Sequence, residues 1–104
     1  MTIADNDVQD GVISEQRREV KEPPMFKVLL HNDDYTSMDF VILVLESVFH
    51  KRAEDATRIM LNVHQQGVGV AGVYTRDMAE TKIALVHDLA RHQEYPLKCS
   101  LEQM

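Results

Sequence analysis

Three polar side chains follow an apolar run near the start of the chain. Asn32, Asp33 and Asp34 come directly after MFKVLLH, residues 25–31. Such residues begin turns and helices, because their side chains hydrogen-bond neighbouring backbone groups. They could also bind a ligand, because the carboxylates carry negative charge and the amide oxygen accepts hydrogen bonds. A turn is the simpler interpretation unless another polar group lies in the same place.

His64 is the residue that could supply that group. It comes four residues after Met60 and directly after Val63, at the edge of an apolar stripe in the last turn of a helix. A single histidine there is more often a helix cap or a packed side chain. Beside Asn32 and the two aspartates, however, a neutral imidazole would complete a set of acceptors suited to a substituted ammonium ion. Four apolar residues could form a slot beside this set: Met38, Val41, Met60 and Val63.

Metal binding and nucleophilic catalysis are alternative uses of these residues. Asp and His can hold a divalent ion, although no pair of histidines at i and i+4 supports such a site. A nucleophile is less favoured, because Cys99, the only cysteine, falls on a core-facing strand position and no Gly-x-Ser-x-Gly elbow is present. We therefore expect neither a metal nor a cofactor.

Composition excludes several classes of protein. The chain has 104 residues, enough for one domain with one core, and 44% of them are hydrophobic. The net charge of −6 argues against binding to nucleic acid or to an anionic membrane surface. The longest apolar run, residues 40–45, is far shorter than the roughly 20 residues of a membrane span. The amino terminus also lacks the apolar segment of a signal peptide. We expect a cytoplasmic monomer.

The first part of the chain differs from the rest. Residues 1–22 are rich in acidic side chains and contain no aromatic residue, which predicts a flexible extension. Pro23 and Pro24 mark the boundary, because a proline disfavours helix in the residue before it. We expect residues 23–104 to form the folded domain.

The elements of that domain follow from periodicity and end signals. Residues 25–31 predict a buried strand. Residues 36–50 predict a helix that begins with a Thr36–Asp39 capping box, and residues 53–67 predict a second helix that ends at Gly67. Residues 68–75 predict a strand weakened by two glycines, which indicate a bulge or a close approach of another part of the backbone. A third helix begins near Arg76 with Thr75 as its cap, and residues 96–102 alternate like a strand with one wet face.

The predicted order is therefore β-α-α-β-α-β, an α+β domain. Three short strands cannot cover both sides of a core, so the three helices should pack on one face of a mainly antiparallel sheet.

Three segments of the chain, in order, resemble the ClpS adaptor family: VLLHNDDYTSMDFVILVLESVF, ATRIMLNVHQQGVGVAGVYTRDMAETK and YPLKCSLE. The patterns NDDYT.M.FV, A...M..VH..G and G.YT...AE.K are jointly specific, and the likeness covers residues 23–104. It implies three helices on a three-stranded antiparallel sheet. It also implies an adaptor rather than an enzyme. ClpS proteins bind proteins whose first residue is Leu, Phe, Tyr or Trp and deliver them to a ClpA-type AAA+ unfoldase for degradation by ClpP.

The resemblance also assigns a role to the polar residues. It implies that Asn32, Asp33 and His64 recognise a free α-amino group, partly through water. Asp34 would add negative potential and help to fix the turn. The pocket for the first side chain would be formed by Thr36, Met38, Val41, Met60, Val63 and Leu97.

Two further positions match residues that dock the N-terminal domain of the unfoldase. These are Asp77 and Lys82, although a lysine at the edge of a helix is usually a solvated charge. Position 31 adjoins the pocket in relatives and is commonly aliphatic there, so His31 departs from the family pattern.

A non-catalytic interaction domain of similar topology, like the C-terminal domain of the ribosomal stalk protein, is the main alternative. It would not require Asn32, Asp33 and His64 to converge. A small metal-dependent hydrolase is a weaker alternative, and it would require a bound ion.

Overall fold

The computed structural model describes residues 22–104, and their elements come in the predicted order. They are β1 (Met25–His31), α2 (Met38–Ser47), α3 (Ala53–Gln66), β2 (Val68–Thr75), α4 (Arg76–His92) and β3 (Lys98–Gln103). The flexible extension expected for residues 1–22 lies, except for Glu22, outside the described residues. Within residues 22–104, no helix is long and apolar enough to cross a membrane.

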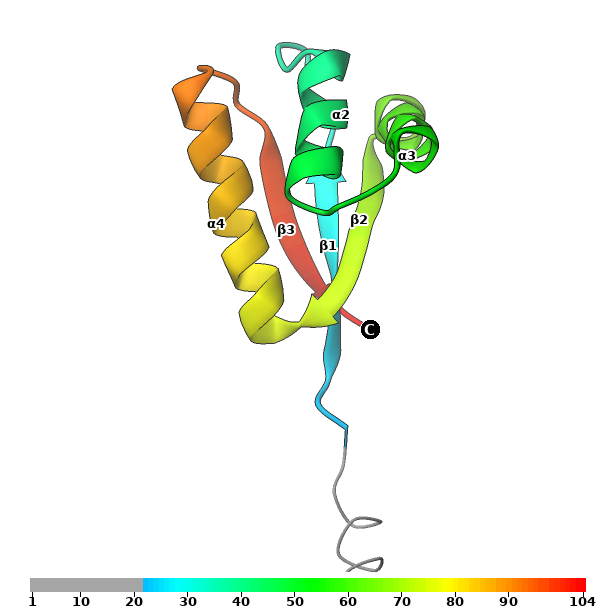
Figure 1. Ribbon diagram of the computed structural model, residues 1–104, viewed down its shortest axis with the longest axis vertical. Coiled ribbons are helices and arrows are strands. Elements are labelled where there is room, and N and C mark those ends of the chain that lie inside the picture. The colour runs from blue at the N-terminus through cyan, green and yellow to red at the C-terminus, as the bar shows by residue number, and fades with distance from the viewer. Residues whose placement is uncertain (1–21) are drawn as a thin grey trace, which may run out of the picture.

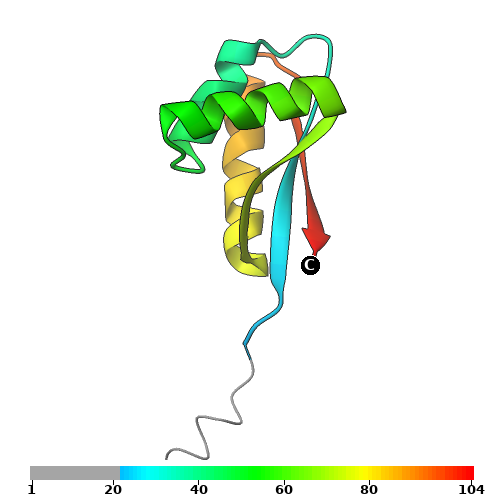
Figure 2. The same ribbon diagram turned by 90° about the vertical axis from the view of Figure 1, so that its right-hand side faces the viewer.

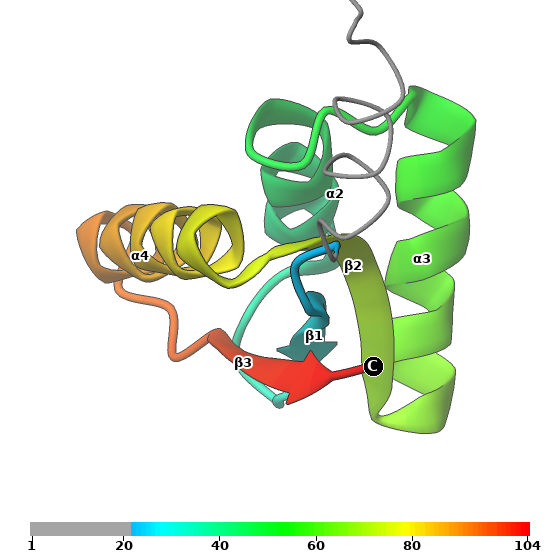
Figure 3. The same ribbon diagram turned by 90° about the horizontal axis from the view of Figure 1, so that it is seen from below.

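The three strands form one antiparallel sheet with β1 in the middle, in the order β2-β1-β3. All three helices lie on one side of this sheet (Figures 1 and 3). α4 lies on the side of β3, α3 on the side of β2, and α2 between them. Figure 2 shows that α3 runs across the strands rather than along them. The predicted α+β class and topology are confirmed.

The core forms between the covered face of the sheet and the helices. Alternate residues of β1 point inward, and Phe26, Val28 and Leu30 are buried. α2 contributes Val44 and Leu45, both fully buried. Complete burial of a side chain of this size stabilises the fold by about 1.5–3 kcal/mol. The buried residues of α2 lie on one side of a helix. This explains why the apolar run at residues 40–45 folds as a helix, although it could also suit a strand.

The predicted bulge occurs in β2 between the two glycines. Val28 pairs with Gly72 but Leu29 pairs with Val70, so the buried Ala71 is the extra residue. Gly69 lies against α3: a Cβ atom there would come within 2.7 Å of the Val63 side chain. β2 and α3 can therefore approach closely only because residue 69 has no side chain.

The helix ends match the predictions except in α2, which runs from Met38 to Ser47 and is therefore shorter at both ends than the predicted helix over residues 36–50. Ser37, not Thr36, is the N-cap, and its hydroxyl accepts a hydrogen bond from the Phe40 N–H at 3.1 Å. The predicted Thr36–Asp39 capping box is wrong, because the Thr36 hydroxyl donates to Asp33 instead and Ser37 makes a single cap bond. α3 ends as predicted at Gly67, whose φ of 88° is the left-handed conformation that glycine adopts without strain.

Gly69→Ala should lower the free energy of unfolding by about 1–3 kcal/mol, the usual cost of overpacking a filled interface. The added methyl group meets Val63, whose backbone in α3 cannot easily retreat. Denaturant unfolding measures the change. Val73→Ala, at an exposed position of the same strand, is the control. Equal stability of Gly69→Ala and the parent would contradict the close packing of β2 on α3.

Candidate functional site

The loop between β1 and α2 is tied to the end of α3. The Asn32 N–H donates to the Gly67 carbonyl over 2.9 Å, directly beyond the last β1–β2 pair, His31 with Val68. Since His64 lies in the last turn of α3, this bond brings it to the same end of the molecule as Asn32. Two segments far apart in the sequence thus border one site.

Asp33 holds the loop in its turn. One carboxylate oxygen accepts from the backbone N–H groups of Tyr35 and Thr36, at 2.8 and 2.7 Å. The other accepts from the Thr36 hydroxyl at 2.7 Å. Partial burial tends to raise the pKa of Asp33, but the bonds from Thr36 and Tyr35 outweigh it and lower the pKa below its ordinary value. The turn-fixing role expected of Asp34 therefore belongs to Asp33, because Asp34 is exposed and lies outside these bonds.

A cavity of about 340 Å³ opens between this loop and the two helices α2 and α3. Eleven residues line it: Asn32, Asp33, Asp34, Tyr35, Thr36, Ser37, Met38, Val41, Met60, Val63 and His64. Nine of the ten residues expected for the α-amino site and the side-chain pocket are in this set. Leu97 is not: it is 4% exposed, within the core.

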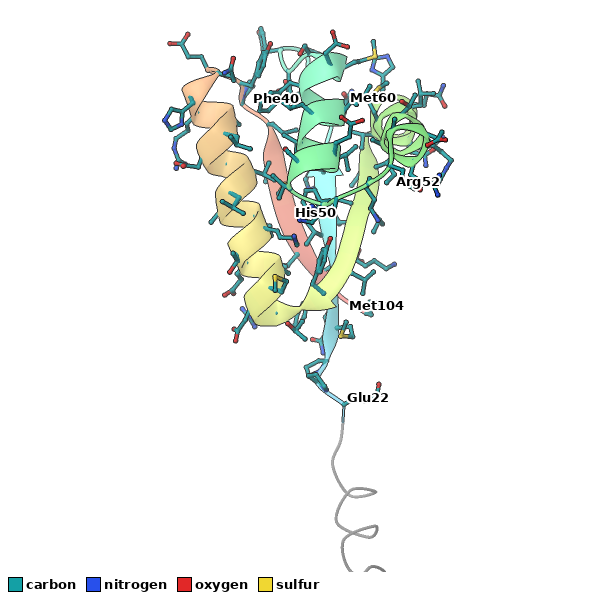
Figure 4. The ribbon with its side chains drawn as sticks, viewed as in Figure 1. Glu22, Phe40, His50, Arg52, Met60 and Met104 are labelled. Carbon is teal, nitrogen blue, oxygen red and sulfur yellow. The ribbon has the colours of Figure 1, made fainter. Side chains whose placement is uncertain are left out.

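The lining divides into an apolar part and a polar part. Val41, Met60 and Val63 are buried and form the apolar wall. Figure 4 shows Met60 on the side of α3 that faces α2. The polar part consists of Asn32, Asp33, Asp34 and His64. No lysine or arginine is among the lining residues, so the cavity suits a cation with an apolar group attached.

Sequence reasoning missed two lining residues, Tyr35 and Ser37. Both lie inside the NDDYTSM segment, so their position in the loop is the only signal that could have indicated them. His31 is absent from the lining. Its Nε2 pairs with the Ser100 hydroxyl across the sheet at 2.7 Å, which directs the ring along β3.

Lys82 is partly buried, and its ammonium group is bonded to the protein instead of being fully solvated. Its Nζ donates to the carbonyl of Val48, the C-cap of α2, at 2.7 Å and lies 5.2 Å from the centre of the Tyr74 ring. Asp77 is exposed in the first turn of α4. That turn lies at the opposite end of the molecule from the β1–α2 loop (Figure 1).

Metal binding and nucleophilic catalysis by Cys99, the two alternative chemistries, find little support in the described part of the chain. Among residues 22–104, no three His, Cys, Asp or Glu side chains are grouped to hold a metal ion. Burial raises the pKa of the Cys99 thiol to about 12, so the group stays protonated at neutral pH. The backbone N–H of Cys99 also donates to His87 Nε2 at 3.1 Å.

Comparison with known proteins gives the class of protein. A family described as the ATP-dependent Clp protease adaptor protein ClpS matches residues 21–100. The ATP-dependent Clp protease adapter protein ClpS of Desulfatibacillum aliphaticivorans is 60% identical over 91 residues, which is 88% of each chain. That of Phenylobacterium zucineum is 55% identical over 96 residues, 92% of this chain and 88% of the relative.

A solved structure has the same fold. Agrobacterium tumefaciens ClpS2 bound to L-phenylalaninamide matches with a TM-score of 0.77 and 38% identity, over 80% of this chain and 100% of that one.

The chain therefore belongs to the ClpS family. It is an adaptor of the Clp protease, and it is not an enzyme, as the family resemblance implied. Family membership also excludes the hydrolase and ribosomal-stalk alternatives.

Thr36→Val should raise the pKa of Asp33, because it removes one of the hydrogen bonds that stabilise the carboxylate. A carboxyl group whose pKa is lower in the folded chain stabilises the fold above the unfolded pKa. The stability that the Asp33 carboxylate contributes is lost as the pH falls through the pKa that this group has in the folded chain. NMR titration of the Asp33 carboxyl in both proteins measures the difference. An Asp33 pKa at or above 3.8 in the parent would contradict the bonds described.

Proposed function

We propose that this adaptor binds proteins through a free N-terminal Leu, Phe, Tyr or Trp. In this proposal it passes them to a ClpA-type AAA+ unfoldase for degradation by ClpP. The observation that supports this most is the cavity, which joins an apolar wall to a group of acceptors and carboxylates without a competing cation. The ligand of the related ClpS2, L-phenylalaninamide, has the matching chemistry, since it carries an α-amino group beside a phenyl side chain.

The polar part selects a chain end. An α-amino group has an ordinary pKa of about 7.7–8.0, so it is mostly charged at neutral pH. Burying that cation is costly unless acceptors surround it, and an internal or acetylated amine carries no such charge. Asn32 and His64 are proposed as direct acceptors. Asp33 already accepts three bonds from its own loop, so its share is smaller or passes through water, and Asp34 adds negative potential.

The apolar part supplies a large share of the affinity. An aromatic side chain buries about 150–250 Å², worth at most about 4–6 kcal/mol at 25 cal/mol per Å². Each hydrogen bond to a charged group contributes about 1.5–3 kcal/mol net, but every free α-amino group can make these bonds. The slot that Thr36, Met38 and the three buried residues form therefore decides which chain ends bind tightly. Met38 is 48% exposed and lies at the mouth of the slot.

Delivery uses a separate part of the surface in this proposal. Asp77 and Lys82, both on α4, dock the N-terminal domain of the unfoldase, and neither is among the residues that line the cavity. Residues 23–104 form the adaptor domain, and residues 1–22 form the extension that the unfoldase engages during handover. The protein works as a cytoplasmic monomer.

Asn32→Ala and His64→Ala should each weaken binding of a Leu-initiated peptide by about tenfold or more, because each leaves a buried ammonium short of an acceptor. Fluorescence anisotropy with the free peptide and its N-acetylated form measures this, and the parent should bind only the free form. Asn62→Ala, an exposed asparagine on the same helix as His64, is the control. Parental affinity in both site variants would refute the proposed α-amino site.

Met38→Ala should admit peptides that begin with Ile or Val. Side chains branched at Cβ carry two heavy atoms there, and in this proposal Met38 clashes with them. Relief of such a clash is worth about 1–3 kcal/mol, which is about five- to 150-fold in affinity. Competition between Leu-, Ile- and Val-initiated peptides measures the change. Met78→Ala, at another exposed methionine on α4, should leave the discrimination unchanged. If Met38→Ala still excludes Ile-initiated peptides as the parent does, another residue of the slot rejects side chains branched at Cβ.

A further inference from the structure

Three histidines in the described part of the chain have a ring nitrogen bonded to another group, and two of these bonds survive protonation of the ring. His92 Nδ1 lies 2.9 Å from the Asp88 carbonyl, which can only accept, so the ring is the donor with or without a second proton. His31 Nε2 lies 2.7 Å from the Ser100 hydroxyl, which can accept or donate, so this pair also adapts to a protonated ring.

His87 is the exception. Its Nε2 lies 3.1 Å from the backbone nitrogen of Cys99, and a backbone N–H can only donate. Nε2 must therefore be the ring nitrogen without a proton, so the neutral ring carries its proton on Nδ1. A second proton, on Nε2, would set one N–H against another, and the bond would be lost.

This bond joins α4 to the edge of the sheet. β3 has a neighbouring strand, β1, on one side only, so the backbone N–H groups that point away from β1 need another partner. α4 lies beside β3 (Figure 1), and the half-buried His87 supplies that partner for Cys99. The side chains of Leu97 and Cys99 are buried, so the start of β3 is shielded from water. An N–H left without an acceptor in such a place destabilises the fold locally.

No ion pair compensates for a proton on His87. Among the described residues, no carboxylate forms a salt bridge with this ring, and the nearest in sequence, Asp88, is paired with Arg91 at 3.1 Å. Burial raises the pKa of the Cys99 thiol to about 12 and raises that of the Tyr74 phenol, so both are neutral at neutral pH. The other charged side chains of β3 and of the segment before it are exposed: Glu94, Lys98 and Glu102.

The two remaining strands add no charge next to α4. β1 directs only apolar residues to the side of the sheet that the helices cover, and Ala71 and Tyr74 are the corresponding residues of β2. The inward residues of β1 are Phe26, Val28 and Leu30.

We propose that His87 is a proton-sensitive latch, which holds the start of β3 on α4 at neutral pH and releases it when the ring is protonated. An ordinary histidine changes its charge at about pH 6.5, so mild acid operates such a latch. The released segment carries Leu97 and Cys99. Just before it lies Tyr95, whose ring is 4.9 Å from that of Phe40 in α2. Neither a bound peptide nor an unfoldase takes part, so the latch does not depend on the proposed function.

Amide hydrogen exchange of Cys99, followed by NMR on the full chain, tests this proposal. Each rate is divided into the intrinsic rate of an unfolded chain at the same pH, which gives the protection of the amide. We expect the protection of the Cys99 amide to fall about five- to tenfold between about pH 7.5 and about pH 5.5, the effect of one lost hydrogen bond. The amide of Val28, in the central strand, should change less.

Two variants assign the change to His87. The side chain of His87→Gln cannot take up a proton in this range, so the protection of Cys99 should be the same at both pH values, whatever its starting value. His92→Gln, on the same helix, is the matched control. It should show the parental fall, because the bond of His92 does not depend on a neutral ring.

The tautomer of the ring is a second, independent measurement. Nitrogen NMR of the His87 imidazole above pH 7 should show Nε2 as the nitrogen without a proton, and a proton on Nε2 in the neutral ring would overturn the proposal. Protection of Cys99 that does not fall in the parent would overturn it as well. An equal fall in His87→Gln would do the same, because another group would then be responding to acid.

Discussion

One backbone hydrogen bond, from the Asn32 N–H to the Gly67 carbonyl, joins the two halves of the site. It depends on Gly67, whose left-handed conformation ends α3 and turns the chain into β2. A residue with a Cβ would adopt that conformation only at a cost of about 1–2 kcal/mol. Because this bond lies beyond the last β1–β2 pair, it extends the sheet by one step and sets His64 opposite the loop. The cavity is therefore a consequence of how the sheet ends.

The two adjacent carboxylates of the loop lie in different surroundings. The Asp33 carboxylate accepts three bonds from residues of its own turn, which stabilises the loop but leaves fewer lone pairs for a ligand. The Asp34 carboxylate is exposed and keeps its capacity to act on a cation. Adjacent identical residues thus differ in their bonding, because Asp33 accepts from the backbone two and three residues ahead while Asp34 is exposed.

Sequence periodicity predicted the elements and their order, because burial on one face repeats along a helix or a strand. The two glycines of residues 68–75 indicated the bulge in β2. It failed where two neighbouring residues have the same chemistry. Thr36 and Ser37 can both cap a helix, and the choice fell to Ser37 because Asp33 engages the Thr36 hydroxyl. The convergence of Asn32 with His64 came from family resemblance, since a contact between residues so far apart in the chain leaves no periodic signal.

α2 lies between the cavity and α4, the two parts of the molecule that the proposed function uses. Its first turn contributes Met38 to the cavity, and the carbonyl of Val48, directly after its last residue, accepts from Lys82 of α4. Helices packed on a common core move little relative to one another, because a close-packed interior transmits strain instead of absorbing it. A cargo bound in the cavity is then carried on the same rigid body as α4, which carries the proposed docking residues. A shared scaffold of this kind lets an adaptor hold cargo and unfoldase together without a conformational change between them.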